Sequence, residues 1–168
     1  VIATEDSTTV NILLTENSLH HQANTPFSVS LNAGQCYQVK STSGVDLSGS
    51  IISASGDKKI AVFAGNHWVH IPNNIDGGDH VVEQMMPTSA WGKEFVITNS
   101  MLRTKDKVKV TALNNNCQVW KDGVLLTTLN ARQTYEFEIT NIVPVAYLET
   151  SEPACVFLYF TGSRYGGD

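Results

Sequence analysis

The sequence predicts an all-β protein made of two tandem repeated antiparallel units, each β-sandwich-like or barrel-like, joined by a loop-rich connector. Three observations support this prediction. Apolar and polar residues alternate with a period of two in several short segments. A seven-residue motif occurs twice, as LNAGQCY in residues 31–37 and as LNARQTY in residues 129–135. Helical patterning is almost absent, so the apolar faces of the strands must be covered by other sheets.

The repeated motif predicts an internal duplication. Its two copies share five of seven residues at an offset of 98. Further segments match in the same order, namely residues 9–12 with 107–110, residues 2–4 with 96–98, and the stretches beginning at Ser55 and Ser151. We therefore expect a first β repeat over residues 1–65, a connector over residues 66–94 and a second β repeat over residues 95–168.

Individual strands follow from local patterns. Tyr135, Phe137 and Ile139 alternate with polar residues, as do Tyr37 and Val39 in the first copy. This alternation places one side of a strand in a core and the other side in water. Residues 59–64 and 154–160 are continuous apolar runs of strand length, a pattern typical of strands covered on both faces.

Two short signals predict local turns. Asp122-Gly123 predicts a tight hairpin, because both central residues of such a turn need positive φ. In the connector, Asp79 is placed to cap a short helical turn that Pro87 would end.

Composition excludes several function classes. The 168 residues are 42% hydrophobic and 16% charged, with a formal net charge of −5. This negative charge would repel a nucleic acid, and the sequence has no basic stripe that could bind one. No apolar run is long enough for a membrane-spanning helix, so we expect no membrane insertion of this segment. Its first residue, Val1, suggests a piece of a longer polypeptide.

Three cysteines leave the disulfide question open. Cys117 and Cys155 lie in the same half and could bridge, which would leave Cys36 alone. Buried free thiols on strands are the alternative, and the odd count favours it.

The connector contains the residues that suggest metal chemistry, which are His67, His70 and His80 with Asp79 and Glu83. Positions three apart on a strand point to opposite faces, so His67 and His70 cannot share a metal without a bend. Asp76-Gly77-Gly78-Asp79 is a second cation candidate, for calcium, although turn chemistry explains the same residues. We expect no metal and no cofactor. The chain also lacks a Gly-x-Ser-x-Gly elbow and any singled-out carboxylate pair, so we expect no enzyme.

The tryptophans are the remaining candidates for binding. Trp120 precedes the predicted hairpin turn and is expected to be the most exposed, with Trp68 and Trp91 as further candidates. An exposed aromatic ring packs well on a sugar, whereas most tryptophans fill cores or interfaces. Trp68 and Trp91 are also expected to anchor the connector by packing, while Asp79 and His80 bond its loop. Glu83 is expected to be a further structural residue of the connector.

The order of motifs along the chain resembles the IgG Fc-binding protein N-terminal domain family. The motifs that carry the resemblance are residues 1–10, 31–39, 46–53 and 60–65, then DHVVEQMMP at 79–87 and WGKEF at 91–95. The second half resembles the family more loosely, through residues 129–135 and the strand after Pro153. Members occur in animal mucin-like secreted proteins and in large bacterial surface proteins.

The resemblance implies an extracellular or cell-surface all-β module without established catalytic or binding residues. Family members often carry a cysteine just before the Asp-His of the motif and another in the preceding strand region. Here Gly78 occupies the first place, and no cysteine lies between Cys36 and Cys117. The connector is therefore expected to be fixed by packing and hydrogen bonds.

These observations together predict a noncatalytic adhesion or interaction module of a larger, bacterial surface or secreted protein. Its expected partner is a protein or glycan on a host or neighbouring surface, including host glycoproteins. The alternatives are a carbohydrate-binding module and a metal-dependent enzyme that uses the connector histidines.

Overall fold

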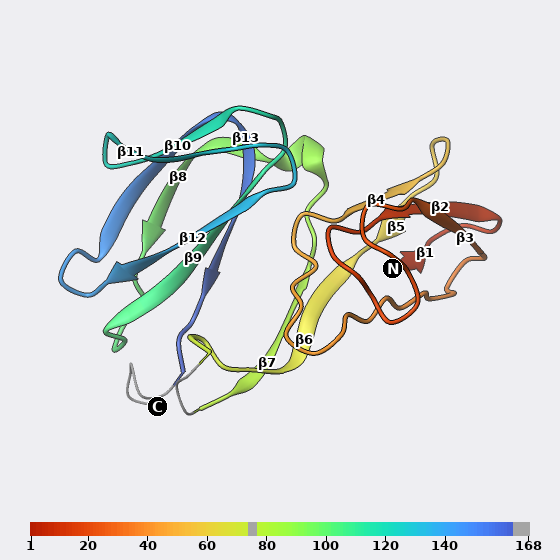
Figure 1. Ribbon diagram of the computed structural model, residues 1–168, viewed down its shortest axis with the longest axis horizontal. Helices are drawn as coiled ribbons and strands as arrows, with labels where there is room; N and C mark the ends of the chain where they lie inside the picture. The colour runs from red at the N-terminus through yellow and green to blue at the C-terminus, as the bar shows by residue number, and fades with distance from the viewer. Residues whose placement is uncertain (74–76, 163–168) are drawn as a thin grey trace. The chain divides into compact units, whose positions relative to one another are not determined.

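The computed structural model describes residues 1–73 and 77–162 (Figure 1). The prediction of an all-β protein is confirmed, because the described part of the chain forms strands and a single 3-10 turn, η1 at Thr88–Ala90. The chain divides into two compact units. The first comprises residues 1–64 with 83–85, and the second comprises residues 65–82 with 86 onward.

The first unit is built on a three-stranded antiparallel sheet, in the order β3-β2-β4, and a two-stranded pair, β1-β5. Its strands are β1 Ile2–Ala3, β2 Thr8–Leu13, β3 Phe27–Leu31, β4 Ile51–Ala54 and β5 Ile60–Ala61. The small core consists of Ala3, Val10, Ile12, Leu14 and Leu31. Val10 and Ile12 alternate with half-buried residues along β2, which is the period-two pattern expected for a strand above a core.

A hairpin of β6 (Phe63–Val69) and β7 (Asp79–Gln84) follows. The helical turn expected after Asp79 is wrong, since Asp79 is the first residue of β7. Pairing with β6 outweighs the capping signal, and Val81 and Val82 are β-branched residues that favour a strand. The short helical segment of this region lies beyond Pro87, as η1.

The second unit is a six-stranded antiparallel sheet that curls around its core as a half-barrel. Its strands are β8 Gly92–Thr98, β9 Lys105–Ala112, β10 Cys117–Lys121, β11 Val124–Leu129, β12 Thr134–Thr140 and β13 Val145–Tyr159. The predicted hairpin at Asp122-Gly123 is confirmed, because these residues have φ of 50° and 80° and link β10 to β11. The predicted alternation along β12 is also confirmed, with Ile139 buried in the core.

The long strand β13 organises the second unit. Its first part pairs with β8 and β10, and its second part, from Ala154 to Tyr159, pairs with β9. The register with β8 shifts between Glu149 and Ala154, next to Pro153, which has no N–H to give to a ladder. One strand therefore contributes core residues at both ends, including Leu148, which is fully buried, and Ala154.

The two copies of the repeated motif form turns with the same hydrogen bonds. In the first copy, the side-chain Oε1 of Gln35 accepts the backbone N–H of Asn32 at 2.8 Å. In the second copy, Oε1 of Gln133 accepts the backbone N–H of Asn130, also at 2.8 Å. The backbone N–H of each glutamine returns to the asparagine carbonyl, at 2.9 Å and 3.0 Å.

The residue before each glutamine also has the same backbone conformation and hydrogen bond in both turns. Gly34 and Arg132 both adopt positive φ, of 77° and 73°. Their N–H groups donate to the carbonyls of Ala3 and Ala112, each at 2.9 Å. Ala3 and Ala112 thus accept the equivalent hydrogen bond from the two turns, whereas the sequence alignment matched Ala3 with Ile97.

The pairing of β2 also differs from that of the segment with which the sequence alignment matched it. Strand β2 pairs with β3 and β4, and β10 likewise pairs with β11 and β13. Residues 107–110 lie instead on β9, which pairs with β12 and β13. By its pairing, β2 resembles β10 more than β9. The sequence alignment could not distinguish them, because alternating short strands can be aligned in several registers with similar sequence scores.

Candidate interaction surface

The connector histidines do not converge in the structure. His67 and His80 are exposed on β6 and β7, while His70 follows β6. Nε2 of His70 accepts a hydrogen bond from Nε1–H of Trp68 at 3.2 Å, and Nδ1 of His80 lies 2.9 Å from the Asp79 carboxylate. The backbone N–H of His80 donates to the Asp79 carboxylate at 2.7 Å, and this bond, with the smaller contribution of the His80 ring, lowers the pKa of Asp79. These are local contacts that shape the hairpin.

No group of three or more potential ligands gathers around a cation position among the residues described. Glu83 is exposed on β7, and Asp76 of the acidic glycine loop lies outside the described residues. The arrangement therefore gives no support to the metal-dependent alternative.

The prediction that Trp120 is the most exposed of the three tryptophans is wrong. Trp68 is the most exposed of them, at 57%, whereas Trp120 and Trp91 are half-buried. Nε1–H of Trp91 donates to the carbonyl of Met86 at 3.4 Å, across η1. Trp120 is not a free platform, because it lies on β10 within the sheet, between Glu149 of β13 and Leu125 of β11.

The register nevertheless places Trp120 on an unusual surface. We call it the acidic–aromatic face, the outer side of β8, β13 and β10, comprising Glu94, Val96, Trp120, Tyr147 and Glu149. Tyr147 lies opposite Val96, and these side chains are 41% and 72% exposed. Glu149 lies opposite both Glu94 and Trp120. An apolar and aromatic patch therefore adjoins two carboxylates.

The two carboxylates of this face lie opposite each other without a cation. Neither Glu94 nor Glu149 has a lysine or arginine partner in the part of the chain that the structure describes. The pKa of Tyr147 is raised by its partial removal from water, by the charges of Glu94 and Glu149, and by a hydrogen bond to Glu94. Like charges directly opposite on neighbouring strands destabilise a sheet, so this pairing weakens the fold.

An ordinary loop contact fixes the adjoining hairpin. The carboxylate of Asp122 accepts the backbone N–H of Tyr147 at 2.9 Å, and Tyr147 O accepts the N–H of Asp122 at 2.8 Å. The first of these bonds, with the ion pair to Lys121 at 3.2 Å, lowers the pKa of Asp122. The position of Tyr147 on the face is therefore held from the backbone.

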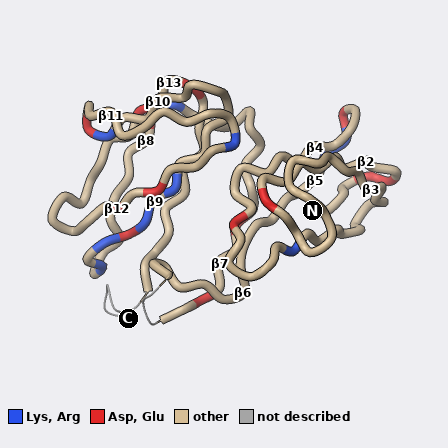
Figure 2. The backbone as a smooth tube through the Cα atoms, in the orientation of Figure 1, with Lys and Arg blue, Asp and Glu red and all other residues tan. Residues whose placement is uncertain are grey.

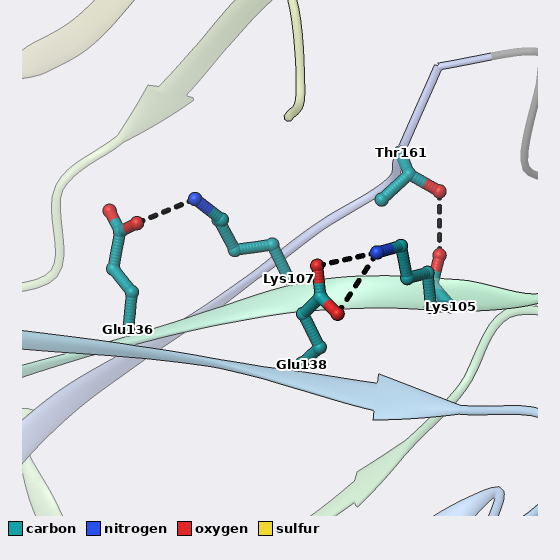
Figure 3. Close-up of polar contacts among 5 residues, drawn as sticks. All are labelled: Lys105, Lys107, Glu136, Glu138 and Thr161. Atoms are coloured by element: carbon teal, nitrogen blue, oxygen red, sulfur yellow. Dashed lines mark hydrogen bonds and ion pairs between the residues drawn. The ribbon is translucent and has the colours of Figure 1, made fainter. Parts of the chain in front are cut away.

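The outer side of β9 and β12 provides the contrast. Its lysines lie on β9 and its glutamates on β12 (Figure 2), and they form cross-strand ion pairs. Lys105 lies 2.8 Å from Glu138 and Lys107 lies 2.7 Å from Glu136 (Figure 3). Lys109 lies 3.0 Å from the same Glu136 carboxylate. On this side the charges compensate one another, which makes the uncompensated pair on the acidic–aromatic face a specific feature.

Sequence reasoning missed Glu94, Tyr147 and Glu149. The available signal was the alternation of Val145, Tyr147 and Glu149 with buried neighbours, which marks an outward row on a strand. Their meeting with β8 depends on long-range pairing, which the local pattern does not specify.

Comparison with known proteins places this fold among relatives. The model of the family described as IgGFc binding protein matches residues 1–168. The chain belongs to the IgGFc-binding protein family. The human IgGFc-binding protein is 30% identical over 160 residues, which cover 94% of this chain and 3% of the relative. No solved structure matches.

Within the IgGFc-binding protein family, the structure explains the glycine at position 78 of this chain. A Cβ added there would lie 2.8 Å from the Trp68 indole and 3.0 Å from His70. A cysteine would displace the indole from this position. The Trp68 indole therefore packs closely over Gly78. Cys36, Cys117 and Cys155 are all free thiols.

Within residues 1–73 and 77–162 no helix has the length and apolar character needed to cross a bilayer.

Proposed function

We propose that this chain is a noncatalytic, extracellular protein-interaction module whose acidic–aromatic face contacts a protein partner. The observation that carries the proposal is the opposed pair Glu94 and Glu149 beside Tyr147 and Trp120. Folding alone does not benefit from this pairing, because it sets like charges together. A cationic side chain from a partner would relieve the repulsion, and the aromatic patch around it would supply apolar contact area.

Immunoglobulin Fc is the first partner to test, because the human relative is named for binding it. This chain spans only a small part of that relative, so the assignment of Fc to this segment is a proposal. We also propose that the module is secreted or displayed at the cell surface. Bacterial origin and contact with host glycoproteins stay predictions.

The experiment measures binding of the chain to immobilised human IgG Fc by surface plasmon resonance. We expect a Glu94→Gln, Glu149→Gln double variant to weaken binding about tenfold, since an unpaired partner cation costs at least 1.4 kcal/mol. Added salt should weaken binding of the wild type more than that of the double variant. Glu138→Gln, on the outer side of β12, is the matched control and should bind like the wild type.

Two outcomes would contradict this proposal separately. Absence of Fc binding would remove Fc as the partner of this segment. An equal loss of binding in the double variant and in Glu138→Gln would remove the acidic–aromatic face as the site.

A glycan is the second candidate ligand, favoured by two aromatic side chains on one face with carboxylates. Trp120 and Tyr147 would contact sugar rings, and Glu94 and Glu149 would accept bonds from hydroxyl groups. A glycan array with Trp120→Ala as the control tests this alternative, and absence of signal would discard it.

We also propose that the two units are copies of one ancestral β module that act as rigid spacers. The shared hydrogen bonds of the turns at residues 32–35 and 130–133 support a common origin. The compensated charges along β9 and β12 suit a passive spacer surface.

A further inference from the structure

The first unit has an open sheet edge at β4. This strand pairs with β2, with Ile12 opposite Ile52 and Val10 opposite Ala54. Among the described residues, β4 is the last strand of its sheet. Its core-facing Ile52 is only half-buried, and its outward Ile51 is 48% exposed.

The hydrogen-bond pattern shows which backbone groups point out of this edge. The N–H of Ser55 donates to the carbonyl of Thr9 on β2 at 2.9 Å. Hydrogen-bonded and non-bonded pairs alternate in an antiparallel ladder. Ile51 and Ser53 therefore direct their backbone groups at β2, while Ile52 and Ala54 direct theirs at the open edge.

The second unit contains the same arrangement with the edge occupied. On β13, the carbonyl of Tyr147 accepts the N–H of Asp122 at 2.8 Å. The backbone groups of Tyr147 therefore point at the β10–β11 hairpin, and those of Leu148 point the opposite way. That opposite side is filled by β8, with Phe95 directly opposite Leu148. Leu148 is fully buried there.

The strands β13 and β4 agree in which side chains point outward and which point to the core at two consecutive positions. Tyr147 and Ile51 are both exposed outward residues, and Leu148 and Ile52 are the core-facing residues that follow them. What differs is the neighbour, because β8 buries Leu148 while nothing in the first unit's sheet covers Ile52 on that side.

We propose that the open edge of β4 binds an extended segment of a partner protein, which adds an antiparallel strand to the β3-β2-β4 sheet. The segment has the pattern of β8, with apolar side chains at alternate positions, as Phe95 and Ile97 are in the second unit. Main-chain bonds to Ile52 and Ala54 supply affinity, and the apolar positions supply selectivity. The inference rests on the correspondence between units and not on the acidic–aromatic face, so each can fail without the other.

The test uses a synthetic peptide with the sequence of residues 91–100 and the ¹⁵N-labelled chain. We expect saturable chemical-shift changes at the amides of Ile52 and Ala54, and hydrogen exchange at these amides slowed about tenfold. Ala54→Pro removes an outward N–H without touching the bonds to β2 and should abolish saturation. Ala54→Val, which keeps that N–H, is the matched control.

Peptide variants keep the test informative even if Ala54→Pro does not fold. In β8 the N–H of Phe95 points at β13 and that of Val96 points away, by the same alternation. Peptide methylated on the Phe95 nitrogen should lose binding at least about tenfold, and peptide methylated on the Val96 nitrogen should keep it.

Four results would overturn the proposal. Absence of saturable shifts, or equal binding by both methylated peptides, would show that β4 does not accept a strand. Shifts at Leu148 and Ala146 in place of Ile52 would show exchange with β8. Self-association without peptide that Ala54→Pro abolishes would assign the edge to a second copy of this chain.

Discussion

Glu136 is predicted to stabilise the second unit more than Glu138 does, although both lie on the outer side of β12. Glu138 contacts one partly exposed lysine, Lys105, whereas Glu136 contacts both Lys107 and Lys109. Lys109 is 8% exposed, and its ammonium also lies 5.7 Å from the Tyr159 ring centre. Removing the charge of Glu136 thus takes a carboxylate from a mostly buried cation.

The magnitudes follow from this difference in burial. An exposed pair such as Lys105–Glu138 contributes about 0.2–1 kcal/mol. Breaking a fully buried pair costs about 3–5 kcal/mol. Because Glu136 is itself partly exposed, we expect Glu136→Gln to cost about 1–2 kcal/mol and Glu138→Gln less than about 1 kcal/mol.

Urea unfolding followed by tryptophan fluorescence is a suitable assay, since Trp68, Trp91 and Trp120 all lie in the second unit. The free energy of unfolding is expected to fall by about 1–1.5 kcal/mol for each molar of urea. Glu136→Gln should therefore lower the midpoint urea concentration by about 1 M. Equal midpoints for the two variants would refute the reasoning, because burial of Lys109 would then contribute nothing.

The pH dependence of the same variant supplies a second check. Partial burial raises the pKa of Glu136, but hydrogen bonds and charge from Lys107 and Lys109 outweigh it, so the net shift is downward from 4.5. A depressed pKa stabilises the folded state above the unfolded-state pKa, and this contribution is lost as the pH falls through the folded-state value. The difference between wild type and Glu136→Gln should therefore shrink as the solution is acidified below about pH 4.5.

Three further predictions concern the hairpin, the thiols and the repeated turns. Gly65→Ala should disrupt the β6–β7 hairpin, because its Cβ would lie 2.2 Å from the Val81 carbonyl oxygen. Faster hydrogen exchange at the amides of Val81 and Val82 would show this, and exchange as slow as in the wild type would contradict it. Cys36 should be the first thiol to react with a disulfide reagent in the native chain, since it is exposed while burial raises the pKa of Cys117 and Cys155; native reaction of all three at one rate would be the contrary result. Gln35→Ala and Gln133→Ala should each cost about 0.5–1.5 kcal/mol for the lost Oε1 acceptor, measured by chemical denaturation, whereas a loss in only one variant would argue against equivalent turns.

Local patterns predicted much of the fold. The positive φ values at Asp122 and Gly123, and the burial of Ile139 on β12, follow from turn chemistry and period-two alternation. The strand expected around Tyr37 and Val39 is wrong in form, since Cys36 makes only an isolated bridge, although both side chains pack against the first core. Residues 59–64 are not covered on both faces either, because Phe63 begins the hairpin strand β6 and is 49% exposed.

The candidate site was the least predictable part. Trp120 was identified from its place before a turn, but its half-buried state depends on the register of β10 between two neighbours. Glu94 and Glu149 lie far apart in the sequence and meet only through β8–β13 pairing. Such pairing is set by the whole sheet, so a pattern read one segment at a time does not reveal it.

The fifteen-residue strand β13 also determines how the second unit can come apart. Since its two ends bond to different neighbours, detaching either end opens the common core and exposes Leu148 or Ala154 to solvent. Unfolding of one edge alone is therefore unfavourable. The strands β9 and β10 should open only when the whole second unit unfolds. A unit of this kind is expected to unfold cooperatively rather than strand by strand.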